Sequence, residues 1–184
     1  MKKIVVAIVA LAMMVSAIAA MADSEKGFTI TPRLAYNFVL DNDARDEVGD
    51  LYGISADVDI ASLPVGFELG YMYGSKSTEC YWGDTKLADY KFTFQSVPVL
   101  VTYKYPFADQ FYAKAAAGVA FDKFKANLKN IDETVTESKT RFAFALGAGW
   151  NFLPNWSTEL AYVNYGKVDD SNIDVIQLNV GYSF

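Results

Sequence analysis

The residues of this chain that could do chemistry are charged side chains set among small and polar neighbours in extended-looking segments. Arg33, Asp57, Glu68, Lys114 and Glu159 each lie roughly four or five residues from a short turn or a chain end. At about 3.3 Å per residue in a strand, the five side chains would lie at a similar depth. We expect them to meet in one interior layer and to pair there, because an unpaired buried charge is costly.

Enzymatic chemistry has little support in the residue types present. The chain has no histidine, which excludes Ser-His nucleophilic catalysis and the usual histidine-containing metal sites. Glu68 and Glu159 are carboxylates of the type that glycosidases use, but no sugar cleft accompanies them. A Ser-Lys or carboxylate-only site stays open, although no nucleophile–base motif is recognisable. We therefore expect no catalytic residue, no metal site and no cofactor.

The five charges leave two interpretations open. The favoured one is a salt-bridged layer that closes the interior. The other is a constricted or gated ion path, in which the same charges select or block ions.

Two polar segments look like binding sites at first sight. Residues 41–47 carry calcium-type ligands, but Asp46 and Tyr52 stand where an EF-hand loop has its glycine and its last glutamate. We expect a solvated acidic loop there. Residues 80–82, Cys-Tyr-Trp, predict an aromatic loop cluster, with an adhesive contact as the alternative. Cys80 is the only cysteine, so no intramolecular disulfide can form.

The first 22 residues are typical of a secretory signal peptide. Lys2 and Lys3 precede the apolar run 4–15, and small residues with two A-x-A sites follow, ending at Ala19 and Ala22. The apolar run is short for a membrane span, and no positive stop-transfer flank follows it. We place cleavage after Ala22, with Ala19 as the alternative, so residues 23–184 form one mature domain.

The mature chain is acidic but rich in apolar residues. Removing Lys2 and Lys3 leaves 14 basic against 22 acidic residues, a formal charge of −8, which argues against a nucleic-acid partner. The whole chain is 52% hydrophobic and 15% aromatic, yet no later segment offers the ~20 consecutive apolar residues of a membrane helix. An exported chain of this kind favours a β-barrel.

Alternating apolar and polar residues predict eight strands. Their ranges are 29–40, 52–60, 65–74, 90–105, 111–122, 141–152, 156–162 and 173–184. In the fourth, the apolar residues change from even positions (Tyr90 to Phe94) to odd ones (Val97 to Tyr103), which predicts a β-bulge near Gln95 to Pro98.

The connections between these segments alternate in length. Short, proline-containing ones lie at 61–64, 106–109 and 153–155; long polar ones lie at 41–51, 75–89, 123–139 and 164–172. Short turns on one side and long loops on the other are typical of outer-membrane barrels.

Alternation alone does not say which face is buried, since a soluble lipocalin-like barrel alternates too. Here the polar face is rich in Gly, Ala and Ser, which leaves room for long side chains such as Arg33, Lys114 and Arg141 in a narrow interior. The aromatics of the apolar face gather near strand ends, as interfacial girdles do. We therefore expect the apolar face to point outward, to lipid.

The last strand ends in Phe184, with Val180 and Tyr182 at alternate positions before it. In these residues the chain resembles the small eight-stranded outer-membrane barrels typified by the transmembrane domain of outer membrane protein A and the opacity-type proteins. The resemblance covers nearly the whole mature chain. It implies an all-β, antiparallel up-and-down transmembrane barrel in the outer membrane of a Gram-negative bacterium. It also implies that Val180, Tyr182 and Phe184 are the signal read by the barrel-assembly machinery.

The function expected on these grounds is non-enzymatic. The chain would be an envelope-structural or surface-loop-displaying protein, with adhesion as a candidate role and its extracellular loop partner unidentified. Two alternatives stay open: a narrow pore or small-solute channel gated by the lumenal charges, and a periplasmic lipocalin-like ligand-binding barrel.

Overall fold

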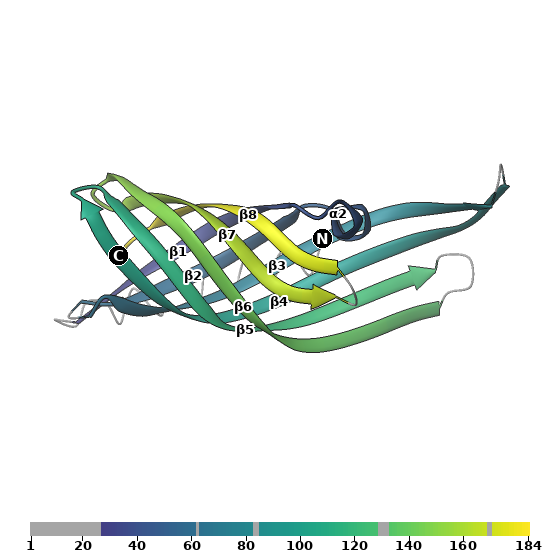
Figure 1. Cartoon of the computed structure of the whole chain (residues 1–184), viewed down its shortest axis with the longest axis horizontal. Coiled ribbons are helices and arrows are strands. Elements are labelled where there is room, and N and C mark those ends of the chain that lie inside the picture. The colour runs from purple at the N-terminus through teal and green to yellow at the C-terminus, as the bar shows by residue number, and fades with distance from the viewer. Residues whose placement is uncertain (1–26, 62, 83–84, 129–132, 169–170) are drawn as a thin grey trace.

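The computed structural model describes residues 27–61, 63–82, 85–128, 133–168 and 171–184, and the predicted signal peptide, residues 1–22, lies outside them. Eight antiparallel strands pair in chain order and close into a barrel, as predicted (Figure 1). The strands are β1 (Phe28–Val39), β2 (Leu51–Ile60), β3 (Val65–Trp82), β4 (Thr85–Ala108), β5 (Phe111–Leu128), β6 (Glu133–Leu153), β7 (Trp156–Val168) and β8 (Ser171–Tyr182). In the described part of the chain, no helix is long and apolar enough to cross a membrane.

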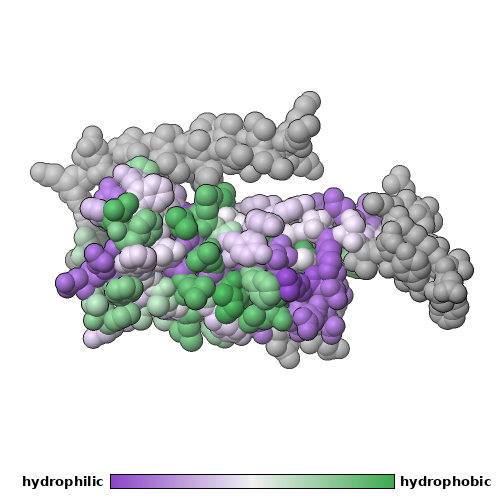
Figure 2. Space-filling view, turned by 90° about the horizontal axis from the view of Figure 1, so that it is seen from above, coloured by the Kyte–Doolittle hydropathy of each residue, from purple (hydrophilic) through white to green (hydrophobic). Residues whose placement is uncertain are grey.

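The barrel is apolar outside and polar inside over most of its height. Leu34 and Phe142 are 67% and 64% exposed, whereas Arg33 and Glu159 are 4% and 2% exposed. Figure 2 shows the result as a hydrophobic wall that gives way to hydrophilic residues toward the end with the long hairpins. A lipocalin-like barrel would bury its apolar side chains instead, so the periplasmic-barrel alternative is wrong.

Two of the predicted long loops are largely strand. β3 and β4 stay paired from Gly74↔Phe94 to Trp82↔Thr85, and β5 and β6 stay paired as far as Leu128↔Glu133. Among the described residues, the pairing of β2 with β3 ends at Tyr73, and that of β7 with β6 ends at Phe144. Four strands therefore continue past the barrel as a sheet, which we call the β3–β6 ribbon (residues 75–82, 85–93, 125–128 and 133–138; Figure 1).

The loop prediction for 75–89 and 123–139 was wrong because it equated polar sequence with loop. A sheet that projects into water needs no apolar face at every residue, since its ladder hydrogen bonds hold it together. The fourth connection is shortened in the same way, because β7 runs to Val168 and β8 starts at Ser171. The side chains of Cys80, Tyr81 and Trp82 lie outside the described side chains, so the aromatic cluster predicted there stays a prediction.

The first long connection holds a short helix, α2 (Asn42–Val48), where a solvated acidic loop was expected. Asp41 caps it by accepting hydrogen bonds from the backbone N–H of Asp43 and Ala44, at 2.9 and 3.0 Å. Gly49, with φ of 68°, ends it in a conformation that suits glycine. Ala44 and Val48 are buried, so the helix lies with its apolar side against the mouth of the barrel.

The predicted bulge in β4 is also wrong. β4 keeps one register from Leu69↔Val99 to Gly74↔Phe94, so its faces do not exchange. The even-numbered aromatics point inward instead, and Phe94 is fully buried. Phe94 belongs to an apolar plug that fills the lumen at the long-hairpin end, below α2. Its members, each at most 4% exposed, are Val39, Val48, Leu51, Met72, Phe94, Val163, Tyr165, Ile173 and Val175.

Candidate functional site in the lumen

The structure brings the five charged residues singled out in the sequence into one interior cluster. Arg33 comes from β1, Asp57 from β2, Glu68 from β3, Lys114 from β5 and Glu159 from β7. All five are at most 4% exposed. They reach the lumen because each occupies an inward position of its strand. We call these five residues the lumenal charge layer.

Two bases hold the layer together. Arg33 Nη2 lies 2.8 Å from Asp57 Oδ2, and Arg33 Nη1 lies 2.9 Å from Glu159 Oε2. Lys114 Nζ lies 2.7 Å from Glu68 Oε2, 3.2 Å from Glu159 Oε1 and 3.3 Å from Asp57 Oδ2. Each carboxylate thus has a cationic partner, which offsets the cost of placing it away from water.

Lys104 is a third base that the sequence reasoning did not single out. Its Nζ lies 2.9 Å from Asp57 and 2.6 Å from Asp59. With Lys104 counted, three bases face the three carboxylates of the layer, so the interior charge balances. The signal was present in the sequence, because Lys104 alternates with the outward Tyr103 and Tyr105 and so must point inward.

Tyr112 is a second residue that was missed. Its hydroxyl donates to Glu159 at 3.2 Å and accepts from Arg33 Nη2 at 3.4 Å. Glycines make the room for these large side chains. A Cβ on Gly181 would lie 2.7 Å from Arg33 Cγ, and one on Gly149 would overlap the ring of Tyr112. The small residues of the polar face therefore leave space in the lumen for the long side chains of neighbouring strands.

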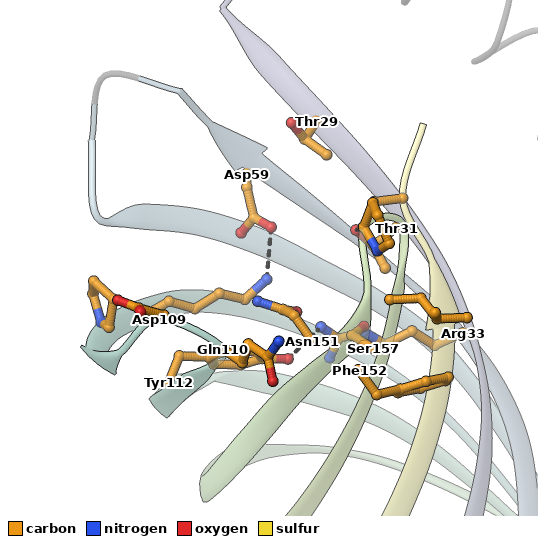
Figure 3. Close-up of a pocket in the computed structure, with 15 residues that line it drawn as sticks. Thr29, Thr31, Arg33, Asp59, Asp109, Gln110, Tyr112, Asn151, Phe152 and Ser157 are labelled. Carbon is orange, nitrogen blue, oxygen red and sulfur yellow. Dashed lines mark hydrogen bonds and ion pairs between the residues drawn. The ribbon is translucent and has the colours of Figure 1, made fainter.

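A vestibule opens on the short-turn side of the layer. It has a volume of about 720 Å³ and is lined by polar residues from both ends of the chain and from the turns, among them Thr31, Gln110, Asn151 and Ser157 (Figure 3). Arg33, Lys104 and Tyr112 also line it, so the charge layer forms its inner end. Water from the short-turn side can therefore reach the layer but meets a wall of paired charges.

The rest of the lumen is closed. Beyond the layer lie a buried pair, Asp122 and Arg141, at 3.5 Å, and then the apolar plug. Phe124 packs against the plug, with its ring centroid 4.8 Å from that of Phe94. Within the described residues, no group of three or more Cys, Asp or Glu side chains is arranged to hold a metal ion. The paired charges and the apolar plug together can exclude water and ions.

The C-terminal residues lie at the lower rim of the wall. Val180 and Phe184 are 40% and 47% exposed on the outer side. The ring of Tyr182 lies edge-on to Trp156 at 5.2 Å and to Phe184 at 4.9 Å. Such a cluster suits the aromatic girdle at a membrane interface.

Comparisons with known proteins agree with this architecture. The model of a family described as the outer membrane protein beta-barrel domain matches residues 7–184. The attachment invasion locus protein of Yersinia enterocolitica is 36% identical over 67 residues, a match that spans 36% of this chain and 36% of that protein.

Two solved structures show the same fold. Ail of Yersinia pestis, crystallised with the heparin analogue sucrose octasulfate, has 18% identity and a TM-score of 0.59 and covers 86% of this chain and 99% of its own. Neisserial surface protein A has 14% identity and a TM-score of 0.59 and covers 86% and 98%. With an apolar wall, a polar closed lumen and a family match over nearly its whole length, the chain belongs to the outer membrane protein beta-barrel family and is a protein of the Gram-negative outer membrane.

Proposed function

We propose that this protein is a non-enzymatic surface protein that attaches the cell to other surfaces, with the barrel as its anchor and the β3–β6 ribbon as its contact element. The observation that carries the proposal is the ribbon itself. Four strands continue past the point where their neighbours stop pairing, so a rigid sheet projects from the membrane. A passive wall protein needs no such extension.

The ribbon also has features of a contact surface. Thr134, Val135, Thr136, Glu137 and Ser138 are all exposed. In the described part of the chain, this stretch of β6 pairs with β5 alone, so one strand edge is open. An open edge offers backbone hydrogen bonds to an extended segment of a partner.

Relatives suggest which partners to test first. The curated relative is named for attachment and invasion, and the Ail crystal holds a heparin analogue. A sulfated polysaccharide and a host-cell surface are therefore the first probes for this chain.

The test removes the ribbon and keeps the barrel. Ser75 pairs with Thr93 and Phe124 pairs with Glu137, so residues 76–92 and residues 125–136 can each be replaced by an Asn-Gly turn. Non-adherent bacteria that display the shortened protein should bind cultured epithelial cells and heparin-coated beads less than bacteria that display the full chain. A variant altered in the short turn 153–155, shown at equal surface level, is the matched control. Undiminished adhesion by the shortened protein would rule out the ribbon as the contact element.

The pore alternative has less support. An ion would have to pass both a charge layer that is paired within itself and an apolar plug. We therefore assign the charge layer the role of a structural closure.

A further inference from the structure

The outward face of β5 gives the position of the membrane boundary. From Phe111 to Phe121 its outward residues are all apolar: Phe111, Ala113, Ala115, Ala117, Val119 and Phe121. Ten steps of about 3.3 Å, at the roughly 40° tilt of such strands, rise about 25 Å along the barrel axis. That equals the usual height of the apolar band, about 25 Å. Lys123 is therefore the first residue above the band, at the level of the lipid headgroups of the outer leaflet.

A groove crosses the wall at this level. Its volume is about 340 Å³, and it draws on four adjacent strands, β3 to β6. The register places its outward residues in two rows, because Val97 pairs with Phe121 and Gln95 pairs with Lys123. The lower row holds Tyr71, Val97 and Phe121, with Thr140 beside Phe121, and is mostly apolar. The upper row is polar and holds Gln95, Lys123 and Ser138, because Lys123 pairs with Ser138. The groove is thus amphipathic along the membrane normal.

The charge of the groove is positive. Of the described residues that line it, the one carboxylate is Asp122, which is 2% exposed and lies 3.5 Å from Arg141 on the lumen side. Two strand positions further out, Lys125 continues the outward lysine face.

On the opposite side of the barrel, carboxylates lie near the long-loop ends of β2 and β8. There Tyr36 donates to Asp50 at 2.6 Å and Tyr162 donates to Asp174 at 2.7 Å. An anion in the outer leaflet is therefore drawn to the β4–β5 side.

We propose that this groove binds a phosphorylated glycolipid of the outer leaflet. Lys123 holds the headgroup phosphate, Gln95 and Ser138 hydrogen-bond to the sugar, and an acyl chain lies along Val97 and Phe121. A lipid fits better than a soluble polyanion because half of the groove is apolar and faces the hydrocarbon. The site shares Ser138 with the exposed stretch of β6 to which attachment is assigned, but its lysine and its apolar row lie outside that stretch.

The test compares lipids that differ in one group. The full-length mature protein is folded in phosphatidylcholine nanodiscs that contain bis-phosphorylated lipid A, or lipid A from which the phosphates have been removed, and bound lipid is counted by native mass spectrometry. Retention of the phosphorylated lipid should exceed that of the dephosphorylated one. Lys123→Gln should lower retention about tenfold, because one charge-assisted hydrogen bond to the phosphate is lost. Phe121→Ser should also lower retention, because it removes the apolar contact with the acyl chain.

Lys76→Gln is the control, because Lys76 is another solvent-facing lysine that contacts Asp46 of α2 instead of the groove. Heat-modified gel mobility verifies that each variant forms a barrel. Equal retention by the wild type and Lys123→Gln would overturn the site. So would equal retention of both lipids, or capture of free sugar phosphate without an acyl chain.

Discussion

Lys114 of β5 reaches Glu68 of β3 at 2.7 Å, past the whole width of β4. The contact ties two strands that share no ladder, and the same ammonium group also contacts Glu159 of β7. Pairing across the lumen therefore adds cross-links that the sheet hydrogen bonds alone do not supply.

The first prediction removes this base. Lys114→Met should lower the free energy of unfolding by about 3–5 kcal/mol, because it leaves buried carboxylates without compensation. Water from the vestibule would move the loss toward the lower end of this range. Urea unfolding in lipid vesicles, followed by tryptophan fluorescence, measures it. Lys125→Met removes the same charge outside the lumen and should change stability by less than about 1 kcal/mol. Equal losses in the two variants would contradict the role of the layer.

The second prediction concerns conduction. The wild-type barrel should show no steady conductance in planar bilayers, and Lys114→Ala should stay closed because the apolar plug still blocks the lumen. Phe94→Ala combined with Lys114→Ala opens both closures and should conduct. A channel in the wild type, or one in Lys114→Ala alone, would restore the gated-pore interpretation.

The third prediction concerns topology. Epitope tags inserted at Pro64 or Pro154, in the short turns, should be inaccessible to antibody on intact cells and accessible after the outer membrane is permeabilised. A tag in the β5–β6 hairpin should be accessible without that treatment. Labelling at Pro64 or Pro154 on intact cells would reverse the orientation of the barrel.

The sequence predicts the barrel well because period-2 alternation and turn spacing are local signals. It also selects the interior charges, since inward position and distance from a turn set the depth of Arg33, Asp57 and Lys114. The height of the strands above the membrane could not be predicted in this way. Polar residues such as Thr134 and Thr136 are compatible with a loop or with a water-exposed ladder, and only the pairing with β5 decides between them.

The apolar plug was missed for a related reason. Even-numbered Phe92 and Phe94 follow the inward phase of β4 without a break, but apolar residues were assigned to the lipid face, so a bulge was invoked. Near the mouth, α2 covers the lumen, and inward apolar side chains pack against Ala44 and Val48. Whether an inward side chain contacts water or is buried depends on the cover that α2 provides. The alternation of apolar and polar residues within a strand carries no information about that cover.

The last prediction concerns assembly. Deletion of Phe184 should lower the amount of barrel in the outer membrane more than it lowers the stability of barrel that has folded. The ring of Phe184 lies at the rim, 4.9 Å from that of Tyr182, and supports no lumenal contact, so its loss removes little packing energy. In the resembling family, however, the terminal aromatic is read by the assembly machinery.

Two measurements separate these effects. Outer-membrane fractions are compared for the wild type, the deletion and Phe184→Tyr, and the purified proteins are refolded in detergent and unfolded in urea. Phe184→Tyr keeps an aromatic ring at the end and should insert normally. The deletion should insert poorly and yet unfold near the wild-type midpoint. Normal insertion of the deletion, or a collapse of its refolded stability, would show that Phe184 acts through packing and not through assembly.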